Sequence, residues 1–274
     1  MLKDRYGSTA LVTGASAGIG KTFAYALAKA QFDLVLVARR KTALEEIAAD
    51  LARTYSVRVH VLDQDLGQKD AADKILEYLN AAGLEIDVLI NNAGLGLHQR
   101  FMEMLPEQIE TMILLNCYAP VVLTHKILPR MKARGKGAVI IVSSAVGQSP
   151  IPNWAVYSAT KSFLTVFAES LYGECQGTGV DILAVLPGDT TTEFRSAGGL
   201  ENRFPVPVRT PEQVVGTTFR ALGRKPSVVD GIFNLGYVLF ARFAPRKWMI
   251  AINKFFWRRC TDREIHPILA GAGG

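Results

Sequence analysis

Six short apolar segments recur along the first two thirds of the chain, and most are followed by a stretch with helical spacing. They are nearly continuous runs of Val, Ile, Leu and Ala, such as LVLVA at 34–38. Strands without polar alternation are covered on both faces, which is typical of a parallel sheet between two layers of helices. We therefore expect an α/β fold with a doubly wound parallel sheet and ligands at the carboxyl ends of its strands. The predicted strands are Thr9–Thr13, Leu34–Ala38, Arg58–Leu62, Asp87–Ile90, Ala138–Val142 and Asp181–Leu186.

The helices predicted around these strands are less sharply bounded. Two long ones are expected, Pro106–Met131 and Trp154–Cys175, and a shorter one over Lys69–Ala82. No uncharged apolar run with helical character reaches about 18 residues, so a membrane-spanning helix is not expected. The chain enters its first predicted strand almost at once, without a charged and then apolar signal segment.

Cysteine content and charge exclude several classes of protein. The three cysteines (Cys117, Cys175 and Cys260) are far apart, which predicts no disulfide framework and no metal site, and favours a reducing, cytoplasmic compartment. Residues 231–260 hold six basic residues and no acidic one, and these six equal the net charge of +6. The rest of the chain is neutral, which disfavours a nucleic-acid partner. We expect one catalytic unit over 1–230 and an extension over 231–274.

The turn after the first strand is rich in glycine. Gly14, Gly18 and Gly20 lie between the strand and the following helix, with the spacing G-x-x-x-G-x-G. Glycine lets a backbone turn tightly and approach a pyrophosphate, which is then stabilised at the positive end of the helix. This context predicts nucleotide binding.

Ser144, Tyr157 and Lys161 form a candidate acid/base group. Tyr157 and Lys161 are four residues apart, so they share one face of a helix, and Ser144 follows a buried strand. An ammonium group beside the phenol would lower its pKa and let it act near neutral pH. Alternatively, such a pair is a half-buried ring with a solvated lysine.

These motifs occur together in an order that resembles the short-chain dehydrogenase/reductase family over about residues 8–230. The motifs are TGASAGIG at 13–20, NNAG at 91–94, Asn116, Ser144 with Tyr157-x-x-x-Lys161, and Pro187-Gly188. The resemblance implies a single Rossmann-type domain, here with a C-terminal helical extension, and an NAD(P) cofactor. It also implies hydride transfer between nicotinamide and a carbonyl or alcohol carbon, and a homodimer or homotetramer.

The resemblance assigns a role to each of four catalytic residues. Tyr157 would donate the proton, and Ser144 would orient and polarise the substrate oxygen. Lys161 would lower the tyrosine pKa and hold the nicotinamide ribose, while Asn116 would keep a water in a proton relay.

Cofactor contacts are implied at the carboxyl ends of the strands. The segment 91–94 resembles the part that lies against the adenine ribose, and Asp65-Leu66 the adenine pocket. The loop 187–192 resembles the part that meets the nicotinamide carboxamide. The expected cofactor-binding residues are Gly14, Ser16, Gly18, Ile19, Gly20, Arg39, Arg40, Asp65, Leu66, Asn92, Ala93, Gly94, Tyr157, Lys161, Pro187, Gly188, Thr190 and Thr192.

The end of the second strand favours NADP(H) over NAD(H). An acidic residue there would bond the free ribose hydroxyls of NAD, whereas Arg39 and Arg40 offer donors that suit a 2′-phosphate. Ser16 could add a hydroxyl donor. The alternative is that both arginines are a solvated start of a helix.

The last third of the sequence concerns the substrate. A lid with a hinge at Gly198-Gly199 is expected between Glu193 and Thr210. The run from Gly231 is aromatic and basic, and Pro245 is expected to divide it into two helices. It would form a pair packed on this domain or on another subunit, or an apolar substrate wall with weak peripheral membrane contact.

We expect an NADPH-dependent reductase of a lipophilic ketone or aldehyde. An NAD-dependent alcohol or hydroxysteroid dehydrogenase is the alternative of the same class. A non-catalytic NAD(P)-sensing or scaffold protein on the same fold is the alternative of another class, and the intact set of four catalytic residues disfavours it.

Overall fold

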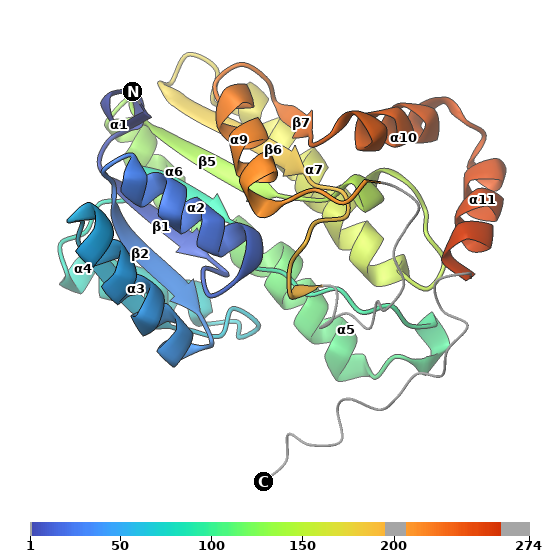
Figure 1. The fold of residues 1–274 in the computed structure, drawn as a ribbon, viewed down its shortest axis with the longest axis horizontal. Coiled ribbons are helices and arrows are strands. Elements are labelled where there is room, and N and C mark those ends of the chain that lie inside the picture. Colours follow the sequence, from blue (N-terminus) through green and yellow to red (C-terminus); the bar gives the residue numbers. More distant parts are fainter. Residues whose placement is uncertain (1, 195–206, 259–274) are drawn as a thin grey trace, which may run out of the picture.

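A seven-stranded parallel sheet organises the protein (Figure 1). The computed structural model describes residues 2–194 and 207–258. The strand order is β3-β2-β1-β4-β5-β6-β7. Strands β2 and β3 therefore lie on one side of β1 and the later strands on the other, so the order of strands reverses between β1 and β4. The bounds are β1 Thr9–Thr13, β2 Asp33–Ala38, β3 Val59–Asp63, β4 Val88–Asn91, β5 Gly137–Val142, β6 Val180–Leu186 and β7 Ser227–Val229. The six predicted strands and the doubly wound parallel arrangement are confirmed; β7 was not predicted.

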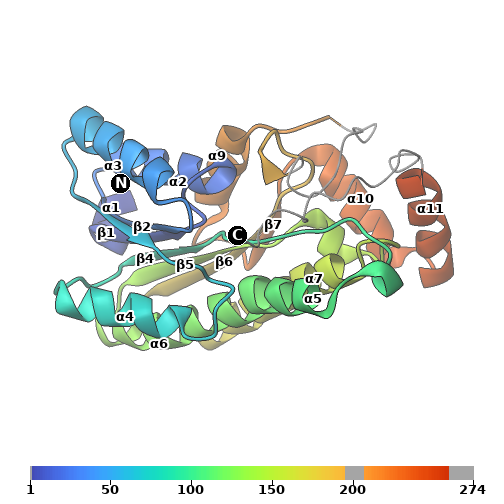
Figure 2. The same cartoon turned by 90° about the horizontal axis from the view of Figure 1, so that it is seen from below.

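Two layers of helices cover the sheet (Figure 2). One layer holds α2 (Gly18–Lys29), α3 (Lys41–Tyr55) and α9 (Pro211–Ala221). The other holds α4 (Ala71–Ala81), α5 (Pro106–Ile113), α6 (Ala119–Ala133) and α7 (Ala155–Glu174). Alternate side chains of β2 enter the two resulting cores, because Leu34 and Leu36 face the first layer while Val35 and Val37 face the second. This burial on both faces is why the strands lack polar alternation.

The helix predicted over Pro106–Met131 is continuous but not uniformly α-helical. A π-helical turn, Leu114–Tyr118, separates α5 from α6 and contains Asn116. By length and mean hydropathy this helix could cross a membrane. However, Met112, Leu123 and Ile127 are buried in the core of the domain, as in the core helix of a globular protein.

Short elements complete the chain. The helix α1 (Leu2–Tyr6), which was not predicted, precedes β1, and its Tyr6 hydroxyl donates to Asp181 Oδ2 at 2.8 Å. The 3₁₀ turns are η1 (Phe101–Glu103) and η3 (Ala145–Gln148). The helix α9 begins with a capping box: Thr210 Oγ1 accepts from Gln213 N, and the Gln213 side chain accepts from Thr210 N.

The extension after β7 forms two helices, divided at Pro245 as predicted. They are α10 (Ile232–Phe243) and α11 (Arg246–Arg258), here called the C-terminal pair. Both views show the pair at one end of the molecule, beyond β7 (Figures 1 and 2). The predicted hinge Gly198-Gly199 lies outside the described residues.

Candidate active site

The glycine turn after β1 has a backbone that requires glycine. Gly14 and Gly18 have φ values of +65° and +51°, and Gly20 packs against the carbonyl of Gly14. Helix α2 starts after Ala17, which offers no side-chain cap to its first N–H groups. These donors and the helix dipole suit an anion such as a pyrophosphate. Ile19 packs on the core behind the turn.

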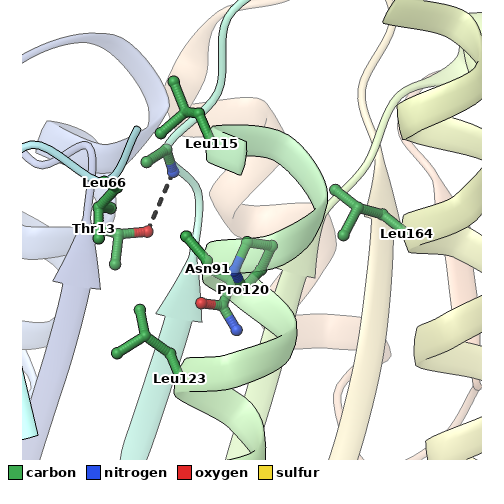
Figure 3. Close-up of a pocket in the computed structure, with 9 residues that line it drawn as sticks. Thr13, Leu66, Asn91, Leu115, Pro120, Leu123 and Leu164 are labelled. Atoms are coloured by element: carbon green, nitrogen blue, oxygen red, sulfur yellow. Dashed lines mark hydrogen bonds between the residues drawn. The ribbon is translucent and has the colours of Figure 1, made fainter. Parts of the chain in front are cut away.

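The NNAG segment is bonded to this turn. Thr13 Oγ1 accepts from the backbone N–H groups of Asn92 (2.9 Å) and Ala93 (3.1 Å), and Figure 3 draws the second bond. Asn92 Nδ2 donates to the Thr13 carbonyl at 2.9 Å. Figure 3 also shows Leu66 beside Thr13, lining a small cavity next to Asn91. Asp65 Oδ1 accepts from Gly67 N at 2.9 Å, which shapes the loop after β3.

Arg40 connects the end of β2 to the glycine turn. Its Nε and Nη2 donate to the hydroxyl and the carbonyl of Ser16, each at 3.2 Å. Its Nη1 also forms an ion pair with Glu193 at 2.9 Å. The structure thus brings Ser16 and Arg40 together, and this pair of hydrogen-bond donors is here called the Arg40–Ser16 corner. The Arg39 side chain is exposed at the same strand end.

The four predicted catalytic residues are buried and come from three neighbouring elements. Ser144 follows β5, Tyr157 and Lys161 lie on the first turns of α7, and Asn116 lies in the π turn. Lys161 Nζ donates to the Val142 carbonyl at 2.8 Å and lies 5.8 Å from the centre of the Tyr157 ring. The alternative of a half-buried ring with a solvated lysine is therefore wrong, because Lys161 is 4% exposed.

Asn116 links the π turn to the loop after β4. Its Nδ2 donates to the Leu95 carbonyl (2.8 Å) and to Thr160 Oγ1 (3.0 Å), and its Oδ1 accepts from Leu95 N (2.8 Å). A methyl group on Gly94 would lie 3.3 Å from both Asn116 Oδ1 and Lys161 Nζ. The two side chains therefore face the same narrow gap, which a glycine leaves open.

The Tyr157 ring stands among apolar groups. Trp154 packs edge-on at 4.6 Å and Phe194 tilts against it at 5.7 Å, measured between ring centres. Burial raises the pKa of Tyr157, and its hydrogen bond with Ser144 opposes that shift. The expected lowering of this pKa by Lys161 is therefore wrong for this structure, in which the ammonium group is engaged by Val142. Tyr157 holds its proton and is a donor.

Burial acts in the opposite direction on Lys161. It lowers the pKa of the ammonium group to about 8, and the nearby Cys117 thiol opposes the shift. The charged and neutral forms of Lys161 are therefore close in free energy near neutral pH.

The loop after β6 closes the site from the other side. Ser144 Oγ donates to the Pro187 carbonyl at 3.3 Å, and buried Thr190 donates to the Gly188 carbonyl at 3.1 Å. Thr192 lies against Gly18, where an added methyl group would approach its side chain to 2.9 Å. The predicted residues of the 187–192 loop thus meet both the glycine turn and Ser144.

Four residues at the site were not predicted. Glu193 pairs with Arg40, and Phe194 covers Tyr157. From the C-terminal pair, Asn234 packs against Gly188, and Asn253 Nδ2 donates to Ser149 Oγ and to the Pro150 carbonyl, both at 2.8 Å. A polar asparagine inside an aromatic helix was the only sequence signal for the last two.

The residues present fit a nicotinamide dinucleotide. The glycine turn and the start of α2 would hold the pyrophosphate, and Asn92–Gly94 and Asp65-Leu66 would border the adenosine half. Lys161 and the 187–192 loop would hold the nicotinamide half, where the gap beside Gly94 is framed by one acceptor, Asn116 Oδ1, and one donor, Lys161 Nζ. When bound, the cofactor supplies the hydride-transfer chemistry that side chains lack.

The sequence is similar to those of known proteins. The short chain dehydrogenase family model matches residues 8–201. The very-long-chain 3-oxoacyl-CoA reductase-A of Danio rerio is 35% identical over 227 residues, covering 81% of this chain and 69% of that protein. The NADP-dependent 3-hydroxy acid dehydrogenase of Schizosaccharomyces pombe is 35% identical over 235 residues, covering 81% and 90%.

Solved structures agree with these relatives. A 7beta-hydroxysteroid dehydrogenase superposes with a TM-score of 0.84 at 29% identity, covering 92% of this chain and 98% of that one. A short-chain dehydrogenase from Sphingobium yanoikuyae in complex with NADPH gives 0.76 at 29% identity, covering 95% and 98%. The chain therefore belongs to the short-chain dehydrogenase/reductase family, whose members are NAD(P)-dependent oxidoreductases acting on CH–OH and C=O groups.

Proposed function

We propose that the protein is an NADPH-dependent reductase of lipophilic ketones or aldehydes. The observation that carries the proposal is the Tyr157 hydroxyl held beside Ser144 at the end of β5, inside an apolar cluster whose burial raises the pKa of the phenol. A donor at this place matches a reaction in which a carbonyl oxygen gains negative charge.

The chain's own residues can supply the proton that the carbonyl oxygen takes up and stabilise the negative charge that forms on that oxygen. The Tyr157 hydroxyl gives its proton to the carbonyl oxygen as that oxygen becomes an alkoxide, and the product is the alcohol. Ser144, whose hydroxyl faces Tyr157, donates to the same oxygen and fixes its position. Lys161, charged below about pH 8, is the nearby group that returns a proton to the phenolate that remains.

The preference for NADPH rests on the Arg40–Ser16 corner. Guanidinium groups bind phosphate through charge-assisted hydrogen bonds, and no acidic residue at the end of β2 competes for the ribose. A 2′-phosphate there would compete with the Glu193 carboxylate for Arg40. The relatives whose names specify NADP or NADPH support this preference.

The lipophilic substrate is argued from the surroundings of Tyr157. Met112, Ile151 and Trp154 form a buried apolar cluster with the tyrosine, and Val146 and Phe194 pack against it. Such a lining favours an apolar group beside the reacting carbonyl, because apolar surface leaves water there. The names of the relatives, a very-long-chain 3-oxoacyl-CoA reductase and a 7beta-hydroxysteroid dehydrogenase, point the same way.

The test is NADPH consumption by the purified protein against ketones graded in chain length and ring number. We expect turnover to rise with apolar size. Tyr157→Phe keeps the ring, so it should lower turnover by about two to four orders of magnitude while binding NADPH with nearly wild-type affinity.

Three results would contradict parts of the proposal. Turnover of the Tyr157→Phe variant above about a tenth of wild type would remove the tyrosine from its role. Faster turnover with NADH would favour the NAD-dependent dehydrogenase. NADPH binding without consumption across the whole panel would favour a sensor or scaffold.

A further inference from the structure

The outer surface of the C-terminal pair is rich in exposed aromatic side chains. Phe243 is 81% exposed and Trp248 65%, on the two sides of Pro245. On α10, Ile232, Leu235, Leu239 and Phe243 recur every three or four residues and are all exposed, so they form an apolar stripe along one side of the helix. Apolar exposure of this density marks a surface with a partner. The exposed aromatic residues of the pair, here called the aromatic surface, are Phe233, Phe240, Phe243, Trp248, Phe255 and Phe256.

The aromatic side chains are exposed because the opposite side of the C-terminal pair is packed against the domain. The inner side of the pair is fixed by buried Asn234, Ala241, Met249 and Asn253. Asn234 Nδ2 donates to the Asp230 carbonyl at 2.6 Å, and Asn253 reaches the loop after Ser144 as described above. The pair is therefore held on the domain with its aromatic residues directed outward. Among the described elements, the pair lies at one end of the molecule, beyond β7 (Figures 1 and 2).

The charge of the pair indicates the chemistry of its partner. Arg242, Arg246, Lys247 and Lys254 are exposed among the aromatic residues, and no acidic residue lies between 231 and 260. Basic side chains beside Trp and Phe are typical of helices that lie in the headgroup region of an anionic bilayer. With 12 and 13 residues, the two helices are too short to cross a bilayer, which needs about 20.

A second copy of the chain fits this surface less well. A two-fold interface brings the same patch of both copies together, so it would oppose basic residues to basic residues without acidic partners. A different exposed apolar face, with Phe163 and Val166 on α7, is free of that repulsion and suits self-association better.

We propose that the aromatic surface and the basic residues around it dock the protein on an anionic lipid bilayer. The helices lie parallel to the membrane plane, with their aromatic rings among the headgroups and acyl-chain ends and their basic groups near lipid phosphates. This proposal does not depend on the cofactor or on the substrate proposed above.

Vesicle flotation of the full chain tests it. The vesicles are phosphatidylcholine alone and phosphatidylcholine with phosphatidylglycerol, at about 0.1 M and about 1 M salt, where the Debye length falls from about 10 Å to about 3 Å. We expect flotation with the anionic vesicles at low salt, and release at high salt.

Substitutions separate apolar from charged contributions. Phe243→Ser and Trp248→Ser should each weaken partitioning at least about tenfold, because an aromatic ring no longer leaves water. Lys247→Glu should weaken it at low salt only. Met102→Ser, an exposed apolar change on the 3₁₀ turn η1, is the matched control and should leave flotation unchanged. Each variant is checked by its thermal unfolding, which these exposed side chains should hardly alter.

The proposal is overturned if the wild-type protein floats with neither vesicle, or equally with both at high salt. It is also overturned if Phe243→Ser lowers the mass of the protein in solution, which would assign the surface to a second copy.

Discussion

Arg39 and Arg40 are neighbours in the sequence but differ in their contacts. Arg40 is bonded to Ser16 and paired with Glu193, whereas Arg39 is exposed at the strand end. Replacing either with Asp puts a carboxylate where a 2′-phosphate is proposed. We expect each change to move the NADPH/NADH ratio of kcat/KM toward NADH by at least about tenfold, as a charged hydrogen bond contributes about 1.5–3 kcal/mol.

Arg53→Asp is the control for net charge. Arg53 lies on α3 and pairs with Asp50 at the surface, so this change should leave the cofactor ratio as it is. An unchanged ratio in both Arg39→Asp and Arg40→Asp would remove the structural basis for NADPH.

The buried Lys161 predicts a pH dependence of stability in the cofactor-free protein. Burial lowers its pKa from 10.5 to about 8, so above about pH 8 the unfolded chain binds a proton that the folded chain has released. The free energy of unfolding should therefore rise with pH in this range. Burial raises the pKa of the Cys117 thiol from 9.0 to about 11, so above about pH 9 this group acts in the opposite direction.

Urea unfolding of wild type and of Lys161→Met between about pH 7.5 and about pH 9 measures this effect. The wild-type midpoint should rise relative to that of the variant, which lacks the titrating group. Parallel pH profiles for the two proteins would contradict the shifted pKa.

At the scale of elements, the long central helix shows what the sequence could and could not predict. Its position follows from helical spacing after Pro106, and the strands around it from their uninterrupted apolar runs. The π turn at Leu114–Tyr118 was not predictable, because it depends on the bonds of Asn116 to Leu95 and Thr160, which are distant in sequence. β7 is only three residues long and leaves too short a pattern to identify.

The candidate active site also contains some residues that the sequence predicts and others that it does not. The glycine turn, Ser144, Tyr157 and Lys161 carry local spacing that a sequence displays, and the structure brings them together. Contacts between Arg40 and Glu193, or between Asn253 and Ser149, join segments separated by about 100 residues or more and have no local pattern. The direction of the Tyr157 pKa shift depends on burial by Trp154 and Phe194, which spacing does not reveal.

The hydrogen bonds from Asn253 on α11 to the loop after Ser144 predict that α11 affects substrate binding. Asn253→Leu removes both donors to Ser149 and Pro150 and leaves buried acceptors without them, at a cost of about 1–3 kcal/mol. We expect KM for a bulky ketone to rise about tenfold, while KM for a small ketone changes little.

The two substrates separate a positioning role from general destabilisation, which would affect both alike. Lys254→Ala, at the next and exposed position of the same helix, is the control and should behave as wild type. Equal effects of Asn253→Leu on both substrates would contradict a role in placing the loop.

At the scale of the whole molecule, the outer face of α7 predicts self-association. Ala159, Val166 and Ser170 are small or apolar and exposed, and Phe163 stacks on Phe167 beside them. Proteins of this family are typically oligomeric, and we expect at least a homodimer joined through a two-fold interface on α7.

Val166→Arg should repel its own copy across that axis and halve the mass measured by light scattering at micromolar concentration. A monomeric wild-type protein at that concentration would contradict the interface.

The C-terminal pair contacts both loops that flank Tyr157: Asn234 packs against Gly188, and Asn253 is hydrogen-bonded to Ser149. A ligand bound to the outer surface of the pair is therefore connected to the same two loops as a substrate bound in the active site. Thermodynamic linkage makes such an influence mutual: whatever factor an outer contact applies to substrate affinity, substrate applies to the outer contact. The two asparagines are thus the route by which an outer contact and the substrate site would influence one another.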